Sequence, residues 1–155
     1  MSAIPSFAAY AAAFEKAYAS DDWSVVEPFF TPDAVYEVGL APPFGGRFEG
    51  RDAILAYFRR VLDGFDRRMG GREVSLLEGP REEGDAVWIR GRAAYGAASG
   101  LPALAFELEE IAAFTAEDAE HGRRIRRLED RYDAATRERL DAYVRDHAGK
   151  LGLTG

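Results

Sequence analysis

The sequence contains no cysteine, so disulfide bonds, thiol nucleophiles and cysteine-rich zinc sites are excluded. Histidine is scarce as well: His121 falls in an expected turn and His147 lies near the end of the chain, so neither is well placed for catalysis. The residue spacing gives no metal-ligand pattern, no glycine-rich phosphate loop and no Ser/His/Asp set. We therefore expect neither a metal nor a cofactor.

Basic charge is also in short supply. Lysine and arginine number 20 against 27 aspartates and glutamates, which gives a net charge of −7. Nucleic acids and anionic membrane surfaces attract basic proteins, so neither is an expected partner. No stretch approaches the ~20 apolar residues of a membrane span, and residues 1–7 do not resemble a signal peptide. Together with the missing cysteine, this favours a cytoplasmic protein.

What the chain does have is an ordinary globular composition, with 47% hydrophobic and 30% charged residues in 155 positions, which suits one domain over residues 1–155. Helical spacing of apolar residues predicts helices over 7–19, 23–30, from 51 to the glycines at 70–71, and at about 134–149. Alternation predicts strands over 33–38, 73–77, 86–98, 104–114 and 123–133. Residues 39–50 are expected to form a loop that is a candidate lid, and residues 79–85 a turn.

Helices thus come first and a run of strands follows. This order indicates an α+β fold with a curved antiparallel sheet wrapped around the N-terminal helices.

One strand carries an acid where an apolar residue is expected. Residues of one parity in the strand at 104–114 share a face, and five of the six are apolar. The sixth is Glu110. A carboxylate among apolar neighbours must find a partner or take up a proton at a raised pKa, and such groups cluster at functional sites. A structural carboxylate bonded to a tyrosine or to a backbone amide is the alternative.

Asp130 is a second candidate acid. It shares parity with Leu128 and Tyr132, so all three are expected to point inward. Ile125 and Leu128 are of opposite parity although both are apolar, which points to a bulge in this strand.

The opposite sheet face combines charges of both signs. Two neighbouring strands present an outward row of Trp88, Arg90 and Arg92 beside Glu107 and Glu109, which predicts a cross-strand charge ladder. A solvated face and a homodimer interface anchored by Trp88 are both open.

Four segments carry a resemblance to a known family: YASDDW at 18–23, FTPDAVYE at 30–37, FEGRDAI at 48–54, and RI followed by LEDRYD within 124–133. Together with the order of elements, they resemble the nuclear-transport-factor-2-like (cystatin-like) superfamily, and within it the SnoaL-like and ketosteroid-isomerase-like branch. The resemblance covers nearly the whole chain. It implies a cone-shaped sheet, an α+β barrel with an internal pocket, and frequent dimerisation through the outer sheet face.

The resemblance also assigns positions, residue by residue. Phe14 stands where the isomerases have a tyrosine, Val38 where they have the catalytic base, and Glu110 where they have a protonated acid that donates to the substrate oxygen. The chain should therefore be inactive as a copy of a steroid isomerase. The epoxide-hydrolase branch places acids on the last two strands, which Glu110 and Asp130 match, but its intervening arginine is not evident.

From these observations we expect an internal, mostly apolar pocket for a small apolar molecule, opening near residues 39–50 and the closing helix. Two functions stay open. One is cofactor-independent general acid–base chemistry of the isomerase, cyclase or hydrolase type, with Glu110 and Asp130 as catalytic residues. The other is a non-catalytic ligand-binding or dimeric scaffold protein; a protein-interaction module has no direct support. The expected ligand-binding residues are Phe14, Tyr18, Tyr36, Val38, Phe58, Tyr95, Phe106, Leu128 and Tyr132.

Overall fold

The computed structural model describes residues 2–152 and arranges six strands in one open sheet, in the order β2-β1-β6-β5-β4-β3. The strands are β1 (Phe30–Val38), β2 (Gly46–Glu49), β3 (Arg72–Glu83), β4 (Ala86–Tyr95), β5 (Leu104–Phe114) and β6 (Ile125–Arg131). Three α-helices accompany them: α1 (Ile4–Ser20), α2 (Arg51–Gly64) and α3 (Ala134–His147). The predicted α+β class is confirmed.

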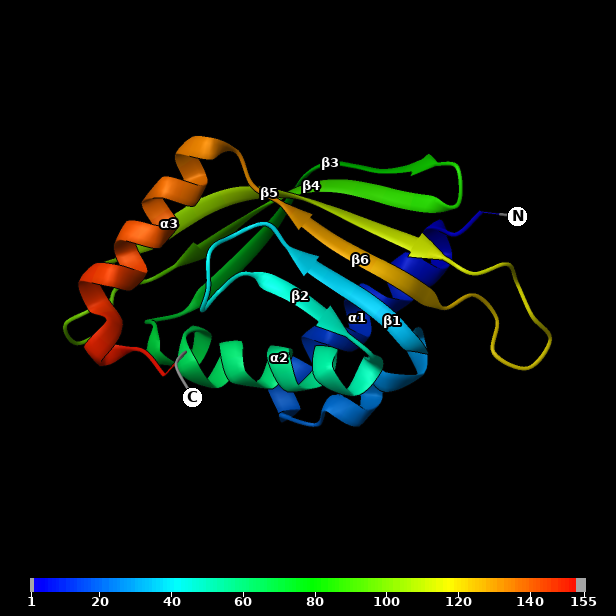
Figure 1. Cartoon of the computed structure of the whole chain (residues 1–155), viewed down its shortest axis with the longest axis horizontal. Helices are drawn as coiled ribbons and strands as arrows, with labels where there is room; N and C mark the ends of the chain where they lie inside the picture. Colours follow the sequence, from blue (N-terminus) through cyan, green and yellow to red (C-terminus); the bar gives the residue numbers. More distant parts are fainter. Residues whose placement is uncertain (1, 153–155) are drawn as a thin grey trace.

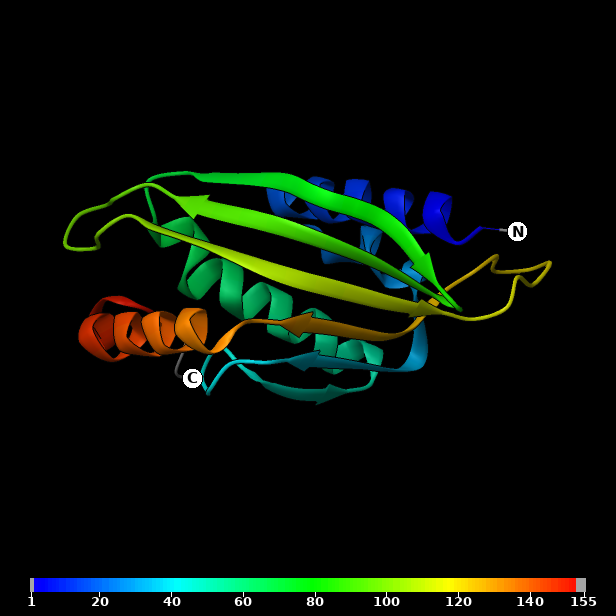
Figure 2. The same cartoon turned by 90° about the horizontal axis from the view of Figure 1, so that it is seen from above.

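The helices are distributed unevenly over the sheet. Figure 1 shows α1 and α2 against one face of the curved sheet, with α3 lying at one end. In the view from above, the opposite face of β3, β4 and β5 carries no helix (Figure 2). A sheet with one covered face and one open face explains the alternation of apolar and charged residues along its strands.

All neighbouring strands are antiparallel except β1 and β6, which run parallel. The prediction of an all-antiparallel sheet is therefore wrong for the pair β1 and β6. A hairpin forces its two strands to be antiparallel, but β1 and β6 are joined through α2 and four further strands, so no turn sets their relative direction. The parallel pairing places Val38 opposite Asp130.

Two expected connections are strand instead. The short strand β2 lies within the predicted loop at 39–50 and pairs with the end of β1. The predicted turn at 79–80 is wrong, because β3 continues through it to Glu83. The register with β4 shifts on either side of Glu78, so that Gly79 and Pro80 have no paired partner. Gly79 has a φ of +92°, and Pro80 has no N–H to donate. An edge strand tolerates such bulges.

The predicted helices agree with the structure only in part. The segment 23–30 forms two short 3₁₀ turns, Trp23–Val25 and Glu27–Phe29, and α2 ends at Gly64, ahead of a 3₁₀ turn at Asp66–Arg68. The closing helix α3 is followed by a last 3₁₀ turn, Ala148–Lys150. No helix within residues 2–152 is long and apolar enough to cross a membrane.

The core lies between the helices and the covered sheet face, in two clusters. The first packs α1 and α2 on β1, with Trp23, Phe30 and Phe58 almost fully buried. The second lies toward α3 and includes Phe65 and Leu140. Full burial of one such side chain contributes about 1.5–3 kcal/mol. A cavity remains between the two clusters.

Candidate functional site

A partly open cavity of about 280 Å³ lies between the two core clusters and is lined mainly by apolar side chains. This volume is near the lower end of the range for small-molecule pockets. Leu40 and Phe44 of the 39–50 segment and Leu140 of α3 belong to its wall, as do eight of the predicted site residues: Phe14, Tyr36, Phe58, Tyr95, Phe106, Glu110, Asp130 and Tyr132.

Three other predicted residues lie outside the cavity wall. Tyr18 packs under the guanidinium of Arg72, whose Cζ is 4.6 Å from the ring centroid. Leu128 is a core residue, 1% exposed. Val38 is buried in β1 and lines a second hollow, on the side of β1 and β6 that includes Glu37 and Glu129.

Glu110 and Asp130 stand directly opposite each other on the antiparallel strands β5 and β6. Both side chains line the cavity, and a bulge in β6 shifts the register between the pairs Ala113–Arg127 and Phe114–Ile125. Without that shift, Ile125 and Asp130 would point to opposite faces. The sequence pattern anticipated this bulge, and the structure confirms it.

The two carboxyls influence each other strongly. Burial raises the pKa of Glu110 well above its usual range, and the adjacent Asp130 raises it further. Burial also raises the pKa of Asp130, but hydrogen bonds from Tyr36 and Glu110 oppose that rise. The shared proton therefore resides on Glu110 while Asp130 is ionised, which is the expected outcome when two like charges occupy one site.

The hydrogen bonds of Asp130 fit this assignment. Its Oδ2 accepts a hydrogen bond from the Tyr36 hydroxyl. Its Oδ1 is buried and finds no donor among the described residues when both carboxyls are ionised. A proton on Glu110 supplies the missing donor, which is why a neutral Glu110 beside an ionised Asp130 satisfies the pair.

Two further tyrosines surround the acid pair. Burial is the main cause that raises the pKa values of Tyr10 and Tyr132, and the carboxyls of Glu110 and Asp130 raise them further. Both hydroxyls therefore lie within electrostatic range of the acid pair. Both side chains line the cavity, and their hydroxyls have no hydrogen-bond partner within residues 2–152. Tyr10, one turn before Phe14 on α1, thus brings a hydroxyl to the region where Phe14 itself offers none.

A second polar group lies in the same cavity wall. Asp66, in the 3₁₀ turn that follows α2, is 6% exposed and accepts a hydrogen bond from the Tyr95 hydroxyl at 3.2 Å. Arg72 Nε lies 3.4 Å from the same carboxylate oxygen, Oδ2. Burial raises the pKa of Asp66 to about 6, and the attraction of Arg72 limits this rise.

The segment 39–50 is fastened over the cavity by the Tyr57 hydroxyl, which donates to the backbone oxygen of Phe44 at 2.5 Å. The Phe44 ring in turn packs edge-on against Phe65, with centroids 5.0 Å apart. The same segment is also held by the pairing of β2 with β1 and by Phe48, whose ring packs on Tyr57 with centroids 4.3 Å apart.

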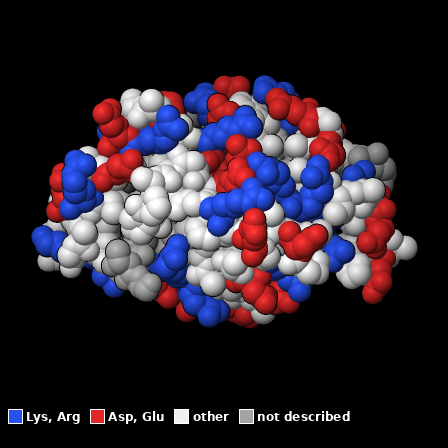
Figure 3. Space-filling model, in the orientation of Figure 1, with Lys and Arg blue, Asp and Glu red and all other residues white. Residues whose placement is uncertain are grey.

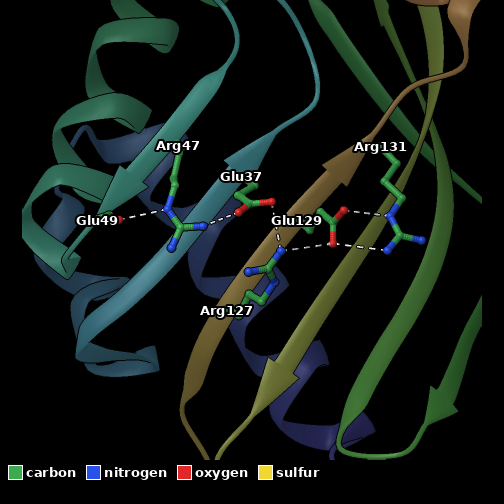
Figure 4. Close-up of polar contacts among 6 residues, drawn as sticks. All are labelled: Glu37, Arg47, Glu49, Arg127, Glu129 and Arg131. Carbon is green, nitrogen blue, oxygen red and sulfur yellow. Dashed lines mark hydrogen bonds and ion pairs between the residues drawn. The ribbon is translucent and has the colours of Figure 1, made fainter.

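The outer face of the sheet carries many ion pairs between neighbouring strands. On β2, β1 and β6 the carboxylates and guanidiniums alternate in one continuous chain (Figure 4), which runs through Glu49, Arg47, Glu37, Arg127, Glu129 and Arg131. Charges of both signs are mixed over the face that Figure 3 displays, and no basic stripe stands out there.

The residues predicted for a dimer interface lie on this outer face as well. Arg90 pairs with Glu78 and Glu107, both at 3.1 Å, and Trp88 donates to Glu109 at 3.1 Å. Trp88 is 8% exposed because Arg81 covers its ring at 4.1 Å, while Arg92 is exposed. Dimerisation through this face stays a prediction, and Trp88 would anchor it only after Arg81 moves.

Four polar residues of the cavity wall were not among the predicted site residues: Tyr10, Tyr57, Asp66 and Arg72. Tyr10 lies on the apolar face of a predicted helix, where a hydroxyl must find a partner or a cavity. Asp66 and Arg72 gave no local signal, because their pairing joins the 3₁₀ turn after α2 to the start of β3. Within residues 2–152, no group of three or more histidine, aspartate or glutamate side chains is arranged to hold a metal ion.

Comparison with known proteins identifies relatives of the fold. A family model described as SnoaL-like domain matches residues 10–119. No curated protein matches the chain.

Several solved structures are similar to most of the chain. An NTF2-like protein of unknown function from Burkholderia pseudomallei has a TM-score of 0.62 at 20% identity, over 90% of this chain and 98% of that one. A ketosteroid-isomerase-like protein from Catenulispora acidiphila, in complex with trimethylamine, has a TM-score of 0.58 at 17% identity, over 81% and 85%. TerC, co-crystallised with polyporic acid, has a TM-score of 0.59 at 17% identity, over 84% and 94%. At these identities the likeness shows the fold alone.

Proposed function

The chain belongs to the SnoaL-like domain family, and we propose that it binds a small, largely apolar molecule in its cavity and transfers protons to and from it with Glu110 and Asp130. The observation that carries the proposal is the pair of cavity-facing carboxyls opposed across β5 and β6, of which Glu110 keeps the proton. Fold relatives crystallised with trimethylamine and with polyporic acid make a ligand in this fold a reasonable expectation.

A neutral acid beside an ionised base suits a carbonyl compound with an acidic C–H. Asp130 takes the proton from the carbon next to the carbonyl, and Glu110 donates to the carbonyl oxygen, which forms the enol. Return of the proton to another carbon gives an isomer. Attack of the enol carbon on a second carbonyl of the same molecule closes a ring: the C=O π bond breaks, the new alkoxide takes the proton from Asp130, and the enol O–H proton returns to Glu110. A positioned acid–base pair of this kind accelerates proton transfer by about 10²–10⁴-fold.

The tyrosines extend this chemistry. The hydrogen bond from Tyr36 holds Asp130 in place and lowers its pKa, so the base stays ionised near neutral pH. The unpartnered hydroxyls of Tyr10 and Tyr132 offer donors to a ligand oxygen near Glu110. The remainder of the wall is mainly apolar and, within residues 2–152, offers no further acid near Glu110 and Asp130 to activate a water molecule, which favours isomerisation or cyclisation over hydrolysis.

The test is the exchange of the α-protons of 2-tetralone in D₂O, followed by NMR. Wild type should accelerate the exchange over buffer, and Glu110→Gln and Asp130→Asn should each remove most of that acceleration while keeping the shape of the side chain. Glu109→Gln is the matched control, because Glu109 is the next residue on β5 but bonds Trp88 on the outer face. It should exchange like wild type.

A non-catalytic binding protein is the second candidate, and two residues favour it. Val38 offers no base and Phe14 offers no hydroxyl at the positions where the isomerase resemblance requires them. If 2-tetralone binds to wild type without faster exchange, or if both carboxyl variants exchange as fast as wild type, the catalytic proposal is refuted and ligand binding alone remains.

A further inference from the structure

We infer that the ligand is elongated and carries a second polar group, a neutral hydrogen-bond donor such as a hydroxyl, which Asp66 receives at the far end of the cavity. The inference rests on the proposed function, since it takes the cavity to be a ligand site. It adds a specificity-determining residue and a chemical class of ligand.

The first argument is the hydrogen bonding of Asp66. Tyr95 and Arg72 both approach the same oxygen, Oδ2, at 3.2 Å and 3.4 Å. No described side chain bonds Oδ1, although the residue is 6% exposed and forms part of the cavity wall. Oδ1 therefore has no side-chain donor, and it is not one of the fully buried polar atoms that lack a partner, so it keeps accessible surface. A ligand in the cavity is placed to donate to it.

The second argument is the position of Asp66. Its partner Tyr95 is the last residue of β4 and pairs with Leu104, whereas Ile89 of the same strand pairs with Glu110. Six residues along a strand span about 20 Å. The two acidic ends of the cavity are therefore well separated along the sheet, with Phe106 and Tyr132 lining the wall as well. A ligand that meets both ends is long and apolar in its middle.

The third argument concerns charge. An ionised carboxylate accepts hydrogen bonds and donates none, so the ligand group is a donor. The guanidinium of Arg72 already balances the charge of Asp66, and it is held there by Glu15 at 2.9 Å and by stacking on Tyr18. A cationic ligand group would face this guanidinium, so a neutral hydroxyl fits better than an ammonium.

The experiment measures dissociation constants for matched aromatic probes by calorimetry. Biphenyl-4-ol and biphenyl-4,4′-diol differ by one hydroxyl, and 4-hydroxystilbene and 4,4′-dihydroxystilbene repeat the comparison at greater length. A symmetric diol gains a factor of two statistically. In wild type we expect the diol of at least one pair to bind about tenfold more tightly or better than its mono-ol, as for a hydrogen bond to a charged group. The 4-hydroxy-4′-methoxy compound, an acceptor of similar shape, should show no advantage.

Variants assign the effect to Asp66. Asp66→Asn should shrink the diol advantage severalfold, and Asp66→Leu should remove it. Asp63→Asn, which changes an exposed carboxyl near the end of α2 that pairs with Arg67, should leave it unchanged. Glu110→Gln should weaken mono-ol and diol together and keep their ratio. Tyr95→Phe preserves the ring and should lower the advantage partly, which covers a failure of the Asp66 variants to fold.

The outcomes separate the two proposals. If the mono-ols bind in a Glu110-dependent manner but no diol exceeds the statistical factor, or if the advantage persists in both Asp66 variants, the role of Asp66 is refuted and the proposed function stands. If none of the phenols binds to wild type, the cavity does not take ligands of this class and both proposals fail.

Discussion

Replacement of Asp66 by asparagine is expected to stabilise the protein relative to wild type as the pH rises. Burial raises the pKa of this carboxyl from 3.8 to about 6, even though Arg72 and Tyr95 oppose the rise. A carboxyl with a higher pKa in the folded than in the unfolded chain binds its proton more tightly when folded. Its contribution to stability is therefore complete below about pH 4 and is lost as the pH rises through about 6.

The magnitude follows from the two pKa values. They differ by about two, and one pKa unit corresponds to ~1.4 kcal/mol, so ionisation of Asp66 costs the folded state ~3 kcal/mol above pH 7. Asparagine has no charge to bury, and its amide oxygen can still accept from Tyr95. The free energy of unfolding of Asp66→Asn minus that of wild type should thus increase by ~2.5 kcal/mol between pH 4 and pH 8, because the unfolded carboxyl is already partly ionised at pH 4.

Urea denaturation at pH 4, 6 and 8, followed by the fluorescence of the buried Trp23 and Trp88, measures this difference. Asp63→Asn serves as the control, because its exposed carboxyl should give a difference that changes by less than ~1 kcal/mol. The competing effect is the attraction between Asp66 and Arg72. If it outweighed burial, the wild type would gain on the variant as the pH rises, and that result would refute the reasoning.

Three further predictions concern other parts of the molecule. Tyr36→Phe removes the donor to Asp130 Oδ2 and should lower the free energy of unfolding by about 1–3 kcal/mol at pH 8. The loss should be smaller at pH 4, where a proton on Asp130 takes the place of the missing donor; urea denaturation at both pH values measures it, and an equal loss at both would count against the prediction. Gly45→Ala should unfold far below the wild-type temperature, because its Cβ would lie 1.5 Å from the oxygen of Leu40; calorimetry checks this, and an unchanged melting temperature contradicts it. We expect sedimentation velocity to find a wild-type dimer, and Arg90→Glu on the outer face to shift it toward monomer; a monomeric wild type would exclude the predicted dimer.

Much of the fold could be predicted from local sequence patterns. The strand at 104–114 agrees with β5 at both ends, because alternation with a period of two is a property of adjacent residues and survives whatever packs against it. The same alternation placed Glu110 on the covered face and Arg90 on the outer one. The conflict in parity between Ile125 and Leu128 correctly announced the bulge that turns Asp130 inward.

Errors arose where local signals were strong but the tertiary structure overrode them. Gly79 and Pro80 form a typical turn pair, yet β3 runs through them because an edge strand can bulge without losing a partner on its free side. The glycine-rich segment 39–50 hides the short strand β2, whose four residues carry too little pattern to detect and are ordered by pairing with β1.

The sequence by itself determined the class of fold, the covered face of each long strand and the presence of an acid among apolar residues, because each depends on neighbours within a few positions. Only the tertiary structure decided which groups meet. It set Glu110 against Asp130, brought Tyr10 toward them from α1 and joined Asp66 to Tyr95 and Arg72. These contacts depend on strand register and helix placement across the chain, which the packing of the whole core fixes and no short stretch encodes.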